Sequence, residues 1–404
     1  MFRKPLLLAA LAAVALTGQA RGQAPAKPAP EKAIDLVICL DVSGSMNGLI
    51  DSAKLRLWDI VNEMARLKPT PNLRVALYSY GHTNYPAANG WVRKDMDLTA
   101  DLDDVYKALN ALTINGGEEY VARVTRAALN EQKWSAEAGA LKLIFVCGNE
   151  PANQDKQVNL DVVAAQAKKA GVIVNTIYCG SGSNPEAKGW ADFAEQCSGR
   201  YMNIDMNKAA VQVAVKTEFD ADILKLGDKL NATYVTYGAA GKRGAENQVA
   251  QDANAVRASA APPGGAFGGR GAAGGLALPP AAPIAALARA ESKAGALYNC
   301  ASWDLVDKMK EKDFDITKIK EEDLCDELKK VKPEERLAYL KKKADERADL
   351  QKQIGELSAK RQKKVDEEVA KMPKTDAQKS LEEAVKGVVR DQAKAKGFEP
   401  GKQK

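Results

Sequence analysis

The chain has 404 residues, which is too long for one ordinary domain and predicts at least one domain boundary. Its net charge of +6 is modest, and its lysines and glutamates are interspersed as on solvated helix faces, which argues against nucleic-acid binding. His82 is the only histidine, and we expect it to be exposed in its polar loop. One histidine is too few for most zinc sites and leaves little scope for a histidine-based catalytic triad. We therefore expect no enzyme activity.

The N-terminus has the pattern of a secretory signal peptide. Arg3 and Lys4 precede an apolar run over residues 5–16, and the small residues Gly18 and Ala20 follow it. We expect residues 1–24 to be a signal peptide and residues 25–32 a Pro/Ala tether. The alternative is an uncleaved anchor, although the run is short for a membrane span. After cleavage we expect no membrane span, and a protein that is secreted or lies in the periplasm or cell envelope.

The most informative segment begins with an apolar run over residues 34–40, typical of a strand buried on both faces of a parallel sheet. The run ends in Asp41, Ser43 and Ser45. Apolar residues then recur at spacings of three and four over residues 49–67, which predicts a helix. Ligands of open α/β sheets bind beyond the carboxyl ends of the strands. Oxygen donors at that position suit a hard cation such as Mg²⁺.

Strands and helices continue to alternate along the next part of the chain. This order predicts an α/β fold with a doubly wound, mostly parallel sheet flanked by helices. Residues 91–98 could form a further strand. The other expected strands are 73–80, 141–147, 172–179 and 200–204, and the expected helices are 101–112, 119–132, 158–170, 185–197 and 208–230.

The Asp-x-Ser-x-Ser motif at Asp41, Ser43 and Ser45, between its strand and helix, resembles the von Willebrand factor A (VWA) family. The resemblance covers roughly residues 33–205 and implies a VWA domain over residues 33–230. It also implies that residues 91–98 are the antiparallel edge strand that the family carries. It further implies a metal-ion-dependent adhesion site that two further loops complete. Glu118 then stands where a threonine is usual, and Asn149 where an aspartate is usual. The metal ligands implied are Asp41, Ser43, Ser45, Glu118 and Asn149, with Mg²⁺, Mn²⁺ or Ca²⁺ as the ion.

Purely structural interpretations of these residues remain open. Asp41 and Ser43 are residue types that cap helices. Glu118 and Glu119 suit the acidic first turn of the helix that follows them. Asn149 could be an ordinary turn residue.

The composition changes beyond the expected VWA domain. Residues 231–254 read as a connecting segment, and residues 255–287 as an Ala/Gly/Pro-rich disordered linker. Residues 288–404 are charged and helical, with helices expected over 333–372 and 375–396. An apolar stripe on the first helix is interrupted by Arg347 and Arg361, which favours a helical hairpin or loose coiled coil. We expect these helices to self-associate or to dock a partner.

Six cysteines in an exported chain invite pairing. Cys39 and Cys147 lie within expected buried strands and favour free core thiols. Cys179 and Cys197 are the best candidates for a disulfide. Cys300 and Cys325 could form a disulfide in the C-terminal region or stay reduced.

The signal-peptide pattern and the resemblance together imply an exported, non-enzymatic binding or adhesion protein, in which an acidic side chain of a protein ligand completes the coordination of the bound metal. The alternative is a structural cell-envelope scaffold with a degenerate metal site, in which the helical tail does the binding. A third interpretation, an accessory subunit of an ATP-driven machine, is disfavoured by the signal peptide because such ATPases work in the cytoplasm.

Overall fold

The computed structural model describes residues 32–203, 215–260, 283–371 and 381–401. The expected signal peptide and all but the last residue of the tether lie outside these ranges. Within the described ranges, no helix is both long enough and apolar enough to cross a membrane.

Six strands form the principal sheet in the order β4-β3-β1-β5-β6-β7, and only β4 runs antiparallel to its neighbour. The α/β fold and the antiparallel edge strand are therefore confirmed. The strands are β1 Ala33–Asp41, β3 Asn72–Tyr80, β4 Val92–Thr99, β5 Leu141–Gly148, β6 Ile173–Tyr178 and β7 Tyr201–Asn203.

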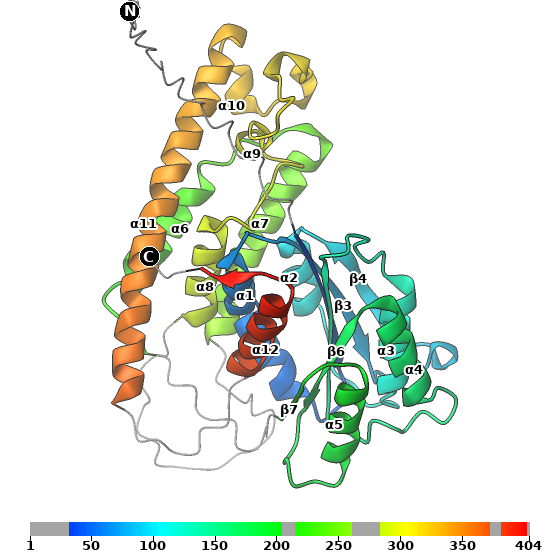
Figure 1. Ribbon diagram of the computed structural model, residues 1–404. Helices are drawn as coiled ribbons and strands as arrows, with labels where there is room; N and C mark the ends of the chain where they lie inside the picture. The colour runs from blue at the N-terminus through cyan, green and yellow to red at the C-terminus, as the bar shows by residue number, and fades with distance from the viewer. Residues whose placement is uncertain (1–31, 204–214, 261–282, 372–380, 402–404) are drawn as a thin grey trace, which may run out of the picture. The chain divides into compact units, whose positions relative to one another are not determined.

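The central strand β1 is apolar on both faces because helices cover both sides of the sheet (Figure 1). Leu36 and Leu40 belong to the hydrophobic core on one face, and Val37 and Cys39 to the core on the other. The first core includes α1 Asn47–Ala65 and α2 Leu102–Asn110. The second includes α3 Val121–Glu131, α4 Leu160–Ala170 and α5 Glu186–Gln196.

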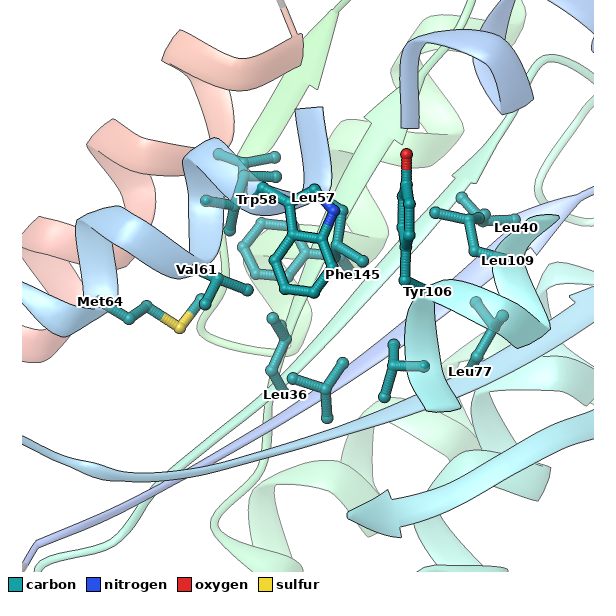
Figure 2. Packing of buried hydrophobic residues seen from close by; sticks show 14 of the residues in the cluster. Leu36, Leu40, Leu57, Trp58, Val61, Met64, Leu77, Tyr106, Leu109 and Phe145 are labelled. Carbon is teal, nitrogen blue, oxygen red and sulfur yellow. The ribbon is translucent and has the colours of Figure 1, made fainter. Parts of the chain in front are cut away.

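Figure 2 shows the first core, in which Leu36, Leu77 and Phe145 of the sheet face the helices. Trp58 of α1 packs edge-on against Tyr106 of α2, with ring centroids 5.1 Å apart. Each such buried side chain contributes roughly 1.5–3 kcal/mol. These contacts pack α1 against the sheet, and the Asp41 motif lies between β1 and this helix.

Further helices follow β7, and the chain returns to the sheet at its C-terminal end. Residues 204–214, where the long helix over 208–230 was expected to start, lie outside the described ranges, and the described helix begins at Asp220. The helices are α6 Asp220–Asn231, α7 Gly238–Ala260, α8 Ile284–Ala294, α9 Leu305–Lys308, α10 Asp326–Lys329, α11 Arg336–Ala370 and α12 Leu381–Ala395. Short 3-10 turns are η1 Ala87–Asn89, η2 Ile316–Lys318, η3 Glu321–Asp323 and η4 Pro333–Glu335, and β2 Leu67–Lys68 pairs antiparallel with β8 Glu399–Pro400.

The segment expected to be a disordered linker is helical at both ends. Residues 255–260 finish α7 and residues 284–287 start α8, while residues 261–282 lie outside the described ranges. The connecting segment 231–254 is also mostly α7. Ala255 and Ala285 are fully buried in the first core, because small side chains let helices approach closely. The domain boundaries remain predictions, but residues of the expected linker pack in the core of the expected VWA domain.

The two arginines that interrupt the apolar stripe of α11 both pair with carboxylates of the same chain. Arg347 is buried, and its Nη1 lies 2.7 Å from Asp304 Oδ2. Arg361 Nε lies 2.9 Å from Asp220 Oδ1 on α6. Helix α11 packs against α6, α8 and α9, so its inward face serves intrachain contacts. Self-association of this region remains a prediction.

The expected Cys179–Cys197 disulfide is wrong, because both residues are buried free thiols. Cys179 lies in the core on one face of the sheet and Cys197 in the core on the other, so the sheet separates them. Cys39 and Cys147 are free core thiols as expected, and Cys300 and Cys325 are also unbridged.

Candidate metal centre

The carboxyl end of β1 turns sharply on its own polar side chains. Asp41 is fully buried, and its Oδ1 accepts a hydrogen bond from the Ser43 backbone N–H at 2.7 Å. The hydroxyl oxygens of Ser43 and Ser45 lie 3.2 Å apart and share a hydrogen bond. The alternate spacing of the motif therefore places three oxygen-bearing side chains on one turn.

None of these side chains caps a helix. The N-cap of α1 is Met46, which makes no side-chain capping bond, and the N-cap of α3 is Tyr120, which makes none either. The first turn of α3 also contains no acidic residue, because Glu118 and Glu119 precede it. The capping and helix-dipole interpretations are therefore wrong here.

The structure brings Glu119 into the centre, whereas Glu118 is exposed. The Asn115 N–H donates to the Val42 carbonyl at 3.0 Å and ties this loop to the end of β1. A Cβ on Gly117 would lie 2.7 Å from the Gly81 carbonyl, so Gly117 faces inward. Side chains alternate along an extended segment, so Glu119 also faces inward while Glu118 faces out. Sequence reasoning placed the acid one residue too early.

The third loop contributes Asn149. Its Oδ1 accepts a hydrogen bond from the Ser45 hydroxyl at 3.2 Å. The Trp190 Nε1–H donates to the Glu150 carbonyl at 2.8 Å and anchors the loop on α5. Of the five expected ligands, Asp41, Ser43, Ser45 and Asn149 are thus together, and Glu119 stands in the place predicted for Glu118.

Glycines let the three loops converge on Asp41. A Cβ on Gly81, whose φ is +83°, would lie 3.0 Å from both Asp41 Oδ1 and Glu119 Cγ. A Cβ on Gly148 would lie 2.6 Å from the Tyr80 hydroxyl and 3.2 Å from Asp41 Oδ2. Side chains at either glycine would therefore displace the acidic pair.

Two buried carboxyl groups face each other in this centre. Burial raises the pKa of Asp41, and the nearby Glu150 charge adds to that effect. Burial and the charge of Asp41 raise the pKa of Glu119. Within the described part of the chain, Asp41 Oδ2 and Glu119 Oε2 are buried and accept no hydrogen bond. A side-chain hydrogen bond, in which Glu119 holds the proton, also joins Glu119 to Asp41. Burying two further carboxyl oxygens without a partner is costly, and a cation that replaces this proton would satisfy both.

The donor set fits a hard cation. It consists of carboxyl, hydroxyl and amide oxygens, which suit Mg²⁺, Mn²⁺ or Ca²⁺. The described residues contain no cluster of three or more His, Cys, Asp or Glu side chains able to hold a metal. The centre therefore depends on the hydroxyls of Ser43 and Ser45 as much as on its carboxyls.

His82, which we expected to be exposed, is 5% exposed. Its ring stacks on Tyr85 with centroids 4.8 Å apart, and its Nε2 lies 3.3 Å from the Thr113 hydroxyl. Burial lowers the pKa of His82. The ring therefore packs the loop that follows Gly81 and supports the centre from one side.

Residues 35–210 match the family model of the von Willebrand factor type A domain. No curated protein matches the chain.

Several solved structures resemble this chain at low sequence identity. Proximal thread matrix protein 1 from the mussel byssus, with a zinc occupied MIDAS motif, is 16% identical, with a TM-score of 0.35 over 44% of this chain and 43% of that chain. The SpRpn10 VWA domain is 18% identical, with a TM-score of 0.33 over 43% of this chain and 88% of that chain. An aerotolerance-related membrane protein from Bacteroides fragilis NCTC 9343 is 15% identical, with a TM-score of 0.32 over 43% and 92%. The chain spans less than half the length of the mussel protein.

Proposed function

We propose that the von Willebrand factor type A domain formed by residues 35–210 binds a divalent cation and, through it, an acidic side chain of a protein ligand. The residues proposed to hold the cation are Asp41, Ser43, Ser45, Glu119 and Asn149. The observation that carries this proposal is the pair of buried oxygens, Asp41 Oδ2 and Glu119 Oε2, that accept no hydrogen bond within the described residues.

Each residue of the site would have its own role in holding the cation. Asp41 holds the turn through the Ser43 N–H and offers its second oxygen to the cation. Glu119 supplies the second carboxyl, and Asn149 holds Ser45 in place. When bound, the cation supplies an electrophilic centre that a carboxylate from outside can approach. Binding rather than catalysis is the proposed activity.

We also propose that the protein acts outside the cytoplasm, which the basic and apolar pattern of residues 3–16 supports. In the alternative, a structural scaffold, the centre would hold no metal and the C-terminal helices would bind the partner. Metal binding by the wild-type protein separates the two.

Thermal unfolding with and without MgCl₂ or MnCl₂ tests the proposal. At ten times the dissociation constant, the metal should stabilise the fold by roughly 1.4 kcal/mol, which raises the melting temperature by a few degrees. Asp41→Asn and Ser45→Ala should abolish or reduce this shift. Asp366→Asn, at an exposed carboxylate on α11, is the matched control and should keep it. No shift for the wild type at millimolar metal would favour the scaffold.

A further inference from the structure

A buried lysine lies in the last turn of α8. This helix packs against α6 and α7 (Figure 1), and Lys293 near its end is 3% exposed. Among the side chains that the structure describes, it is the only buried lysine. A lysine that merely interacts with the carbonyl end of a helix can do so from the surface. Burying its ammonium group is costly unless partners satisfy it, so the partners indicate what the burial serves.

Lys293 contacts an amide and a carboxylate at once. Its Nζ donates to Asn231 Oδ1, on the last residue of α6, at 2.7 Å. It also donates to Asp252 Oδ2, on α7, at 2.7 Å. The same Asp252 oxygen accepts a hydrogen bond from the Asn231 Nδ2–H at 2.7 Å. The amine, the amide and the carboxylate therefore form a closed triangle of hydrogen bonds.

The amine nitrogen lies close to the carbonyl carbon of this amide. A carbonyl bond is about 1.23 Å long, so Lys293 Nζ is at most about 3.9 Å from Asn231 Cγ. Atoms poised to react are about 3–3.5 Å apart. A small rotation of either side chain therefore brings the nitrogen and the carbon into the reactive range.

An apolar cluster adjoins the triangle. Leu230, which precedes the amide residue, and Ala290, one turn before Lys293, are both buried in it. Burial lowers the pKa of Lys293; the charge of Asp252 opposes this effect, and the charge of Arg289 adds to it. A lowered pKa favours the neutral amine, which is the form with a free electron pair.

Arg289 holds the carboxylate of the triangle in place. Its Nε–H donates to Asp252 Oδ1, the oxygen that Lys293 does not contact. The guanidinium is itself buried and fixed, because its Nη1 donates to Asp103 Oδ1 at 2.6 Å. Burial opposes ionisation of Asp252, but the charges of Arg289 and Lys293 outweigh it and lower its pKa. Asp252 is therefore an ionised and oriented group that can accept a proton.

We propose that Lys293 and Asn231 join in an intramolecular isopeptide bond, with Asp252 as the acid–base group. Asp252 accepts a proton from Nζ, and the neutral amine attacks Asn231 Cγ, so that a carbon–nitrogen bond forms and an electron pair moves onto Oδ1. Return of that pair breaks the bond to Nδ2, which takes a proton from Asp252 and leaves as ammonia. The second proton that Nζ loses converts the ammonia to ammonium and leaves Asp252 ionised again. The reaction needs no oxidant, reductant or cofactor.

The bond fastens two helix ends that are far apart in sequence. It forms only once in each molecule, so a small population of neutral amine is enough. It ties the end of α6 to the end of α8, 62 residues further along the chain. A cross-link over such a segment restricts the unfolded chain, as a disulfide does. Because all six cysteines are unbridged, the isopeptide bond supplies the covalent fastening that disulfides give to many exported proteins.

Tryptic mapping of the denatured full chain tests the proposal. Trypsin does not cut after an acylated lysine, so the wild type should yield residues 230–242 linked to residues 290–308, with a mass one ammonia below the sum of the two peptides. A simple ion pair leaves Lys293 free, and trypsin then releases residues 230–242 and 290–293 separately. Recovery of these separate peptides from most of the protein would overturn the proposal. An acid in place of the Asn231 amide, without a link, would show hydrolysis and would also overturn it.

Two pairs of variants test the roles of the residues. Asp252→Asn and Lys293→Arg should each remove the linked peptide. Asp228→Asn and Lys229→Arg, at exposed positions on α6, are the matched controls and should retain it. Circular dichroism shows whether each variant folds, and the wild-type digest decides the proposal even if Asp252→Asn does not fold. An undiminished yield of linked peptide from folded Asp252→Asn would overturn the acid–base role of Asp252.

Discussion

Asn175 on β6 and Gln392 on α12 exchange two hydrogen bonds in the protein interior, although 217 residues separate them. The Asn175 Nδ2–H donates to Gln392 Oε1 at 3.0 Å, and the Gln392 Nε2–H donates to Asn175 Oδ1 at 2.7 Å. Val385 and Val389 of the same helix join the core on the α1 face. The C-terminal helix is therefore part of the folded sheet domain.

Gln392→Ala should destabilise the protein by about 1–3 kcal/mol, because it leaves the buried Asn175 Nδ2–H without an acceptor. Urea unfolding followed by circular dichroism measures the change. Gln196→Ala, at an exposed position on α5, should change the free energy of unfolding by less than about 0.5 kcal/mol. Equal effects of the two substitutions would show that α12 does not pack on β6.

Arg347→Met should cost about 3–5 kcal/mol, since it leaves the fully buried Asp304 carboxylate without its counter-charge. Removing Asp304 as well, in Asp304→Asn/Arg347→Met, should recover part of this loss. Lys342→Met, at an exposed position on the same helix, is the control. An undiminished loss in the double variant would argue that Arg347 acts through packing alone.

The stability contributed by Glu63 should fall in acid. Burial opposes ionisation of Glu63, but the hydrogen bond and charge of Arg390 outweigh it and hold the pKa below the ordinary 4.5. A lowered folded-state pKa contributes stability that is present above the unfolded pKa and is lost as pH falls. The difference in unfolding free energy between the wild type and Glu63→Gln should therefore shrink between about pH 6 and pH 3.5. A difference that is constant over that range would contradict the ion pair.

The buried thiols should resist alkylation in the native protein. Burial raises the pKa of Cys197 to about 12, so little thiolate exists at pH 8. Iodoacetamide at that pH should modify the half-buried Cys325 first and the buried cysteines only after denaturation. Peptide mapping without reductant should find no Cys179–Cys197 bridge. A linked pair of these peptides would contradict the placement of the two thiols on opposite faces of the sheet.

Sequence periodicity correctly predicted the strand, the turn and the helix around Asp41. The apolar run and the alternate spacing of Asp41, Ser43 and Ser45 place the turn correctly, because strand and helix both follow regular repeats. Glu119 was missed because its loop has no such repeat, and its direction is set by the close approach of Gly117 to Gly81.

The long-range errors have a different cause. The apolar residues of a helix show which of its faces is buried but not what covers that face. Sequence analysis therefore assigned α12 to a separate C-terminal region and not to the sheet domain. Cys179 and Cys197 are close in sequence, yet they belong to different faces of the sheet. Which face a residue occupies beyond the end of a strand depends on turn geometry that composition does not encode.

The central claim is that Asp41 and Glu119 together hold a divalent cation. Titration of the full chain with MnCl₂, with free Mn²⁺ measured by electron paramagnetic resonance, tests it most directly. Glu118 and Glu119 are adjacent acids, one exposed and one buried, and so provide a matched pair. The wild type and Glu118→Gln should each bind one Mn²⁺ with similar affinity, whereas Glu119→Gln should bind it at least roughly tenfold more weakly, since a lost charged ligand costs more than 1.4 kcal/mol. Equal weakening by both substitutions, or no Mn²⁺ binding by the wild type at millimolar concentration, would contradict the account.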